Sequence, residues 1–210
     1  MIRVIIADDH GLVRDGLRRM LESTPDIRVV GEAETGDQVV AAVAREHPDV
    51  LVLDVAMPGP GFLEVLRVLR EDHPHTHTVV LSAHAEEEYA ERALKAGAVG
   101  YVTKERTPDD LQDAIRRAAR GLRYISETLA QQLAAHLTGD VARPHHESLS
   151  DREFQVLQLL GQGRSVKEIG AALDLSPKTI STYRERILEK LALKTTADLI
   201  RYAVQHRIAE

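Results

Sequence analysis

A short apolar run that ends in a carboxylate, Val50–Asp54, constrains the fold of this chain more than any other feature. Four consecutive apolar residues are too few for a stable helix and predict a strand that is buried on both faces of a sheet. Pro58 and Gly59 follow shortly and turn the chain away. Asp54 would then lie at the carboxyl end of its strand, where open parallel α/β sheets bind their ligands. By itself, this position fits a functional carboxylate and a solvated strand end equally well.

The apolar pattern alternates between strand and helix from the N-terminus to about residue 121. The predicted strands cover residues 3–8, 27–33, 50–54, 79–81 and 101–102, and the predicted helices cover 11–23, 36–46, 62–70, 86–96 and 108–120. Such alternation with short connections predicts a parallel sheet with helices on both faces. We therefore expect one α/β doubly wound domain with the flavodoxin-like strand order 2-1-3-4-5.

An all-helical pattern begins at Leu149, after a segment with the composition of a linker. A helix over 126–137, N-capped by Ser126, comes first, and a polar stretch broken by glycine and proline follows it. These changes predict a first domain over 1–121, a linker helix and flexible linker over 122–148, and a helical domain over 149–210.

Charge supports the same division of the chain. The whole chain has a net charge of −6. From Leu149 onward ten basic and eight acidic residues give +2, so the preceding part carries −8. An acidic first part joined to a basic second part is typical of a DNA-binding tail on an acidic domain.

Composition also excludes several classes of protein. The chain has no cysteine, which excludes disulfides and thiolate chemistry. It has no apolar run of about 18 residues, so no membrane span is expected. The apolar N-terminus reaches acids at Asp8 and predicts a first strand, not a signal peptide. We therefore expect a cytoplasmic protein.

Polar side chains close or follow the predicted strands. Asp8 and Asp9 close the first, Asp54 the third and Ser82 the fourth, and Lys104 follows the fifth. In a parallel sheet these ends lie along one edge, where clustered carboxylates favour a hard cation such as Mg²⁺. A carboxylate beside Mg²⁺, a hydroxyl and an ammonium can attack a phosphoryl group. Each residue alone fits an ordinary role, such as a cap, a turn or a solvated base, but together they predict a phosphoryl-transfer pocket.

The second part contains a helix-turn-helix pattern. Helices are predicted over 150–160, 165–173 and 176–191, with a last helix that begins at Thr195 or Thr196 and ends near 207. Ser150 with Glu153 forms a capping box, and Ser165 N-caps the second helix. The second and third helices, joined by a short turn, suit DNA recognition in the major groove. Helical periodicity alone fits an ordinary small helical bundle equally well.

Four separated motifs in the first part together resemble a response-regulator receiver domain, over about residues 1–121. They are Ala7-Asp8-Asp9-His10, Leu53-Asp54-Val55-Ala56-Met57-Pro58-Gly59, Leu81-Ser82-Ala83 and Gly97-Ala98-Val99-Gly100-Tyr101-Val102-Thr103-Lys104. The resemblance implies that Asp54 accepts a phosphoryl group from a partner histidine kinase.

The same resemblance implies roles for the residues around Asp54. Asp9, Asp54 and the Ala56 carbonyl would bind Mg²⁺, with Asp8 nearby. Lys104 would pair with the phosphoryl group, Ser82 would swing toward it, and Tyr101 would turn inward afterwards. The sequence departs from the pattern at Phe62, where receivers usually have glycine, so the shape of the preceding loop does not follow from the resemblance.

The second part resembles the LuxR-type DNA-binding domain from Leu149 to about residue 207. The matching motifs lie at 149–157, 165–170 and 175–183. The resemblance implies a four-helix domain with 176–191 as the recognition helix and the last helix as a dimer contact. By position, the base readers would be Ser181, Thr182 and Glu185, and the phosphate contacts would be Lys178, Thr179, Tyr183, Arg184 and Arg186. Gly170 replaces the family's usual alanine, at a cost in helix propensity of about 1 kcal/mol at most.

Together the two resemblances imply a NarL/FixJ-type response regulator. Phosphorylation of Asp54 would favour a homodimer that binds promoter DNA at two half-sites about one helical turn apart. One alternative is an enzyme with a transient aspartyl phosphate, although Ala56 stands where haloacid-dehalogenase-type phosphatases have a second acid. The other is a phosphate-independent regulator that keeps the acid pocket as a relic.

Histidines cluster twice, at His73, His75 and His77 and again at His145 and His146. No acidic or cysteine partners have metal-ligand spacing around them, so solvated loops are expected at both places.

Overall fold

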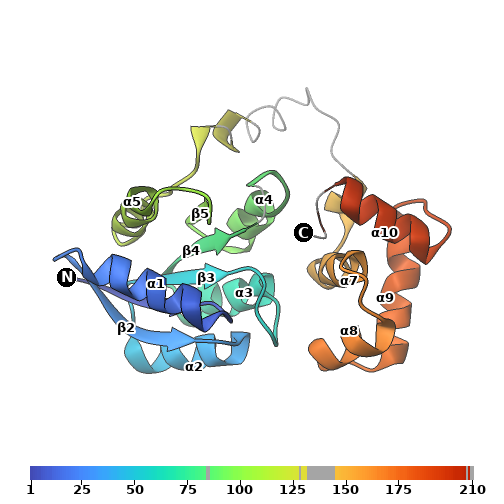
Figure 1. Ribbon diagram of the computed structural model, residues 1–210, viewed down its shortest axis with the longest axis horizontal. Helices are drawn as coiled ribbons and strands as arrows, with labels where there is room; N and C mark the ends of the chain where they lie inside the picture. The colour runs from blue at the N-terminus through green and yellow to red at the C-terminus, as the bar shows by residue number, and fades with distance from the viewer. Residues whose placement is uncertain (84–85, 128, 132–144, 207, 209–210) are drawn as a thin grey trace. The chain divides into compact units, whose positions relative to one another are not determined.

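The computed structural model of the protein describes residues 1–83, 86–127, 129–131, 145–206 and 208. The chain forms two compact units, residues 1–130 and 131–210, which are considered separately (Figure 1). No helix among the described residues is long and apolar enough to span a membrane.

A five-stranded parallel sheet organises the first unit. Its strands are β1 (Ile2–Ala7), β2 (Ile27–Ala33), β3 (Val50–Asp54), β4 (His77–Ser82) and β5 (Gly100–Thr103). Their order is β2-β1-β3-β4-β5, which confirms the predicted doubly wound topology. All five residues of the central strand β3 are buried, as the unbroken apolar run predicts.

Helices cover both faces of the sheet (Figure 1). They are α1 (Gly11–Glu22), α2 (Gly36–Glu46), α3 (Phe62–Asp72), α4 (Glu86–Ala96) and α5 (Pro108–Ala118). One core contains Leu21 of α1 and Leu111 and Ile115 of α5, packed on alternate residues of the strands. α3 contacts both α2 and α4, and these three helices form the other layer. Both faces of β3 are therefore covered, which agrees with the burial of all its residues.

Two predicted details of the first unit differ in the structure. β4 begins at His77, earlier than the apolar residues suggest, because His77 pairs with Val50 in the ladder. Leu12 is one of the apolar residues that give this segment its helical spacing, but it is 87% exposed and does not belong to the stripe of α1 that faces the sheet.

The predicted helix over 126–137 and the linker over 138–148 lie largely outside the described residues. Ser126 does cap a helical turn, because its Oγ accepts the Leu129 N–H at 3.1 Å and its carbonyl accepts the Ala130 N–H at 3.0 Å.

The second unit is helical, as predicted. It contains a 3₁₀ turn, η1 (His145–Ser148), and the helices α7 (Asp151–Gly161), α8 (Val166–Ala172), α9 (Pro177–Lys190) and α10 (Thr196–Gln205). Side-chain N-caps from Ser150, Ser165, Ser176 and Thr195 begin these four helices. The expectation of a solvated His146 is wrong, because its ring is buried with Nδ1 3.0 Å from the Tyr202 hydroxyl.

The presence of glycine at position 170 in α8 is explained by packing, which helix propensity does not reveal. A Cβ at this position would lie 2.7 Å from the Leu175 carbonyl oxygen, and the Leu175 N–H donates to the Gly170 carbonyl at 2.8 Å. The missing side chain lets the turn into α9 close tightly against α8.

Candidate functional site

Strand register brings the predicted acids together at one edge of the sheet. Ala7 lies opposite Leu53, so Asp8, the next residue, comes beside Asp54 at the end of β3. One ligand atom from each of Asp8, Asp9, His10 and Asp54 lies within 4.8 Å of all the others. The sequence therefore predicted the position of the acids correctly, and the structure adds His10 to them.

Lys104 lies between two of these acids. Its Nζ is 2.8 Å from Asp8 Oδ2 and 3.2 Å from Asp54 Oδ1. The loop that carries it is held by the Lys104 N–H, which donates to the Ser82 carbonyl at 2.7 Å. The hydrogen bond therefore holds the loop close to the strand ends, where the Lys104 ammonium can neutralise the negative charge of the carboxylates.

Burial and charge act in opposite directions on Asp54 and Lys104. Burial raises the pKa of Asp54 above its usual value, against the opposing influence of the Lys104 ammonium. Burial would lower the pKa of Lys104, but the hydrogen bond and charge of Asp8 and the charge of Asp54 outweigh it and raise that pKa. Lys104 is therefore a firmly charged partner for a carboxylate that burial penalises.

The oxygens of Asp8 are both engaged by protein groups. Oδ1 accepts the His10 backbone N–H at 2.8 Å, and Oδ2 accepts from Lys104. Asp9 is exposed, with its Oδ1 2.7 Å from His10 Nδ1. Asp9 and Asp54 are thus the carboxylates with room for a further ligand, and this donor set of hard oxygens fits a cation such as Mg²⁺.

Ser82 and Tyr101, the other two predicted switch residues, lie on neighbouring strands. Ser82 ends β4 and is fully buried. The Tyr101 side chain on β5 is fully buried too, so it already occupies the inward position that was expected only after phosphorylation. Its N–H donates to the Tyr124 carbonyl at 3.3 Å, which fastens the segment after α5 to the edge of β5.

The loop between β3 and α3 accommodates Phe62 by turning at an earlier residue. Gly59 has φ +90°, a conformation that favours glycine. Pro60 then packs on Gly36, where a Cβ would lie 2.6 Å from the Pro60 carbonyl oxygen. Phe62 itself is buried, with its ring 6.2 Å from that of Tyr89. Phe62 therefore belongs to the core under the loop and leaves Asp54 and Ala56 at the sheet edge.

The predicted DNA-contacting residues all lie on α9 but differ in exposure. Lys178, Thr182, Glu185 and Arg186 are exposed, whereas Thr179, Ser181, Tyr183 and Arg184 are partly buried. The Thr179 hydroxyl is 2.8 Å from that of Ser176 at the helix cap, and Arg184 Nε is buried. The four exposed side chains are therefore the more accessible part of the predicted set.

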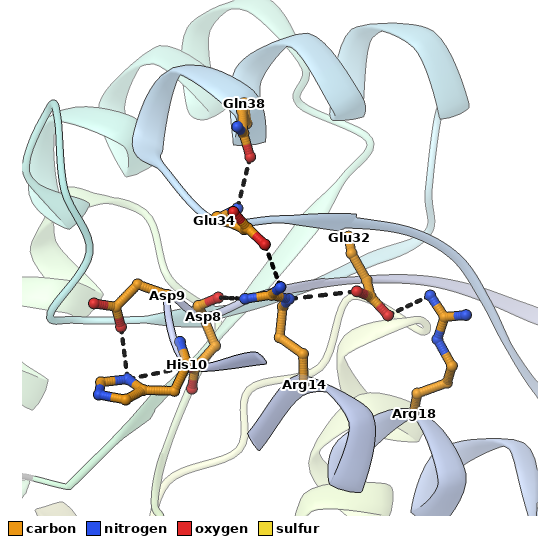
Figure 2. A network of polar contacts seen from close by, with 8 residues as sticks. All are labelled: Asp8, Asp9, His10, Arg14, Arg18, Glu32, Glu34 and Gln38. Carbon is orange, nitrogen blue, oxygen red and sulfur yellow. Dashed lines mark hydrogen bonds and ion pairs between the residues drawn. The ribbon is translucent and has the colours of Figure 1, made fainter. Parts of the chain in front are cut away.

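Two polar residues beside the acids, His10 and Arg14, have no predicted role. His10 directly follows Asp9 and takes the N-cap position of α1. Its place next to Asp8 and Asp9 in sequence is the only signal that could have predicted its position beside the acids. Arg14 is buried in α1 and bonds to Asp8, Glu32 and Glu34 (Figure 2). A signal for Arg14 existed, because it shares a helical stripe with Leu17 and Leu21 at spacings of three and seven residues.

Comparison with known protein families accounts for both units. Residues 4–116 match the response regulator receiver domain, and residues 147–203 match the bacterial regulatory proteins of the luxR family.

Relatives and solved structures match along nearly the whole chain. Response regulator GacA of Pseudomonas aeruginosa is 39% identical over 213 residues, covering 100% of this chain and 99% of GacA. Response regulator UvrY of Escherichia coli K12 is 37% identical, covering 98% and 95%. RcsB of Salmonella enterica serovar Typhimurium, in a structure bound to promoter P1flhDC with the phosphomimetic BeF₃⁻, gives a TM-score of 0.72 at 28% identity, covering 96% and 97%.

Proposed function

The chain belongs to the response regulators that join a receiver domain to a LuxR-type DNA-binding domain, and we propose that phosphorylation of Asp54 controls its binding to promoter DNA. The observation that carries the proposal is the placement of Asp54. It is a carboxylate only 4% exposed, at the end of the central strand, beside the Lys104 ammonium and within reach of Asp9. We assign residues 1–121 to the receiver, 122–148 to the linker and 149–210 to the DNA-binding domain.

The donor in this proposal is a phosphohistidine of a partner histidine kinase. An oxygen of the Asp54 carboxylate forms a bond to phosphorus while the phosphorus–nitrogen bond of the donor breaks. The electron pair of that bond leaves with the imidazole, which takes up a proton. Asp54 can act in this way because Lys104 favours its charged form against the effect of burial.

We assign a Mg²⁺ site to Asp9, Asp54 and the Ala56 carbonyl, with Asp8 beside them. When bound, Mg²⁺ supplies positive charge for the phosphoryl oxygens. Asp8 has a different task, because its oxygens already hold the His10 N–H and Lys104. It orients Lys104 toward Asp54.

The proposed switch is a local change in charge with a conformational consequence. A phosphoryl group adds negative charge at Asp54, to which Lys104 and the Ser82 hydroxyl respond. Ser82 ends β4, and Tyr101 lies on the neighbouring strand β5. Backbone pairing of Tyr101 with Tyr124 then connects this response to the segment that leads out of the receiver. The switch shifts populations and leaves the fold intact.

We propose that the phosphorylated protein binds DNA as a homodimer in the cytoplasm, with α9 in the major groove. Ser181, Thr182 and Glu185 would read bases, and Lys178, Thr179, Tyr183, Arg184 and Arg186 would contact phosphates. The RcsB structure with promoter DNA supports this arrangement by similarity. A dimer compensates for the few positive charges of each domain, because two linked sites bind more tightly than one.

Sedimentation of the full chain with Mg²⁺, before and after addition of beryllofluoride, tests the proposal. We expect a shift from monomer toward dimer together with tighter promoter binding, and Asp54→Ala should abolish both. Asp15→Asn, which changes an exposed acid of α1, is the control and should behave as the unaltered protein does. If Asp54→Ala bound promoter DNA as tightly as the beryllofluoride-treated protein, phosphorylation of Asp54 would not be the switch.

A further inference from the structure

Arg14 is an inward-facing cation beside the acid pocket. It lies in the first turns of α1 and is only 8% exposed. Its guanidinium reaches three segments of the chain (Figure 2). One nitrogen donates to the Asp8 carbonyl oxygen at 2.7 Å, another to Glu32 Oε2 at 3.3 Å, and the third to Glu34. A buried arginine with this many directed bonds fixes the backbone that it touches.

The bond to the Asp8 carbonyl determines where Asp9 lies. The peptide between Asp8 and Asp9 is planar, so its oxygen and the Cα of Asp9 belong to one rigid group. When Arg14 holds that oxygen, it also fixes the start of the Asp9 side chain. The Asp9 side chain is exposed and pairs with the exposed His10, so the backbone of Asp9 is the part that the fold can hold.

The end of β2 supports both sides of the Asp8 backbone. The Asp8 N–H donates to the Ala33 carbonyl at 3.2 Å. Glu32 and Glu34 flank Ala33 in sequence and hold Arg14, which in turn holds the Asp8 carbonyl. Glu34 is oriented as well, because its N–H donates to Gln38 Oε1 at 2.8 Å.

The same acids neutralise Arg14. Glu32 also pairs with Arg18, one turn further along α1, so two arginines face two glutamates (Figure 2). An uncompensated arginine next to a cation site would repel the cation. Because of this pairing, Arg14 can hold the backbone of the pocket in place without adding a net positive charge beside the cation site.

We propose that Arg14 is a positioning residue for the cation site: through the Asp8 carbonyl it holds Asp9 where Asp9 and Asp54 can share a divalent cation. This inference rests on the proposed function, in which Asp9 and Asp54 bind Mg²⁺. It predicts that loss of Arg14 weakens Mg²⁺ binding in protein that is still folded.

The test is calorimetric titration of the full chain with Mg²⁺, at a temperature where circular dichroism shows each variant to be folded. Arg14→Met should raise the Kd for Mg²⁺ about tenfold or more, as removal of supporting residues around metal ligands commonly does. Arg14→Lys keeps the charge but loses the directed bonds, so it should recover thermal stability more than Mg²⁺ affinity. Arg18→Met is the matched control, because Arg18 shares Glu32 but lies away from the Asp8 carbonyl (Figure 2).

Phosphorylation by acetyl phosphate gives a second readout. In Arg14→Met the Mg²⁺ concentration for half-maximal phosphorylation should rise, and the maximal rate at saturating Mg²⁺ should stay close to that of the unaltered protein. A folded Arg14→Met that binds Mg²⁺ as tightly as Arg18→Met overturns the inference and leaves the proposed function standing. Absence of Mg²⁺ binding by the unaltered protein overturns both. If Arg14→Met does not fold, Arg14→Lys decides by the same comparison.

Discussion

The Lys104 ammonium lies 3.2 Å from Asp54 Oδ1, and its side chain is 25% exposed. This contact joins the proposed nucleophile to the loop after β5. The same ammonium bonds to Asp8, so one cation serves two buried carboxylates. In the absence of a metal ion, Lys104 is the group that compensates their mutual repulsion.

Replacement of Lys104 by Met should therefore destabilise the metal-free receiver and increase its response to Mg²⁺. We expect a loss of about 1–3 kcal/mol, since a buried pair is broken but the ammonium is partly solvated. Mg²⁺ should restore more stability than it adds to the unaltered protein, because it replaces the missing positive charge. Scanning calorimetry with and without Mg²⁺ measures both effects.

Lys95→Met is the control for this prediction, because Lys95 of α4 is exposed and also pairs with an acid, Glu91. It should change stability little, and its response to Mg²⁺ should match that of the unaltered protein. If Lys104→Met and Lys95→Met gained equally from Mg²⁺, Lys104 would not compensate the acids at the cation site.

Substitution of Gly36 by Ala should displace the loop that follows Asp54. The added Cβ would lie 2.6 Å from the Pro60 carbonyl oxygen, a backbone atom that must move. The Gly36 N–H also donates to the Pro58 carbonyl at 3.0 Å, so the shift would reach the residues nearest Ala56. We expect a destabilisation of about 1–3 kcal/mol, typical of overpacking, and weaker Mg²⁺ binding.

Gly16→Ala separates this effect from helix propensity. Gly16 lies inside α1, and a Cβ there would meet nothing within 4 Å. The substitution should stabilise the protein by about 0.5–1 kcal/mol without changing Mg²⁺ affinity. Denaturant unfolding and Mg²⁺ titration of both variants provide the comparison, and a Gly36→Ala protein as stable as Gly16→Ala would contradict the close approach at Pro60.

The order of strands, helices and caps was predictable because each depends on neighbours in sequence. The apolar composition of Val50–Asp54 alone predicts a buried strand, and the spacing of Ser150 and Glu153 predicts the start of a helix. The pocket followed from topology, since parallel strands place Asp8, Asp54 and Lys104 at one edge.

Features that depend on distant contacts were not predictable from the sequence. The helical stripe shared with Leu17 and Leu21 indicates that Arg14 faces inward, but its role could not be predicted because its partners Glu32 and Glu34 are on another strand and loop. The buried position of His146 depends on Tyr202, far along the chain. Gly36 differs from an ordinary loop glycine only because Pro60 packs on it. In each case sequence supplies the residue type, and only the fold supplies its partner.

Protonation of Glu153 should weaken the DNA-binding domain in acid. Burial is the largest influence on this carboxyl and would raise its pKa, but hydrogen bonds from Lys190 at 2.6 Å and from the Ser150 N–H at 2.7 Å together lower the pKa below its usual value. Because the folded state holds the charged form more strongly than the unfolded chain does, this contribution is present above about pH 4.3, the ordinary value for Glu. It is lost as the pH falls through the lower pKa of the folded state.

Glu153→Gln should remove about 1–2 kcal/mol at pH 7 and flatten the loss of stability on acidification. Glu168→Gln is the control, since Glu168 has the equivalent cap position in α8 with Ser165. Glu168→Gln should cost less stability, because Glu168 is exposed and is bonded to Ser165, whereas Glu153 is buried and is also bonded to Lys190. Protection factors of α7 amides at pH 7 and pH 4, from hydrogen exchange of the full chain, measure the effect, and equal pH dependence in Glu153→Gln and the unaltered protein would contradict it.

Two exposed residues of α9 should affect DNA binding in different ways. Arg186 is a proposed phosphate contact, so Arg186→Ala should weaken binding to all DNA sequences and reduce the salt slope by about one. Glu185 is a proposed base reader, so Glu185→Ala should change sequence preference and leave the salt slope less affected. Fluorescence anisotropy with promoter and scrambled DNA over a range of salt concentrations separates these outcomes.

Arg120→Ala removes an exposed arginine of the first unit and controls for net charge. Equal salt slopes for Arg186→Ala and Arg120→Ala would place Arg186 outside the DNA contact, and unchanged preference in Glu185→Ala would remove Glu185 from the base readers.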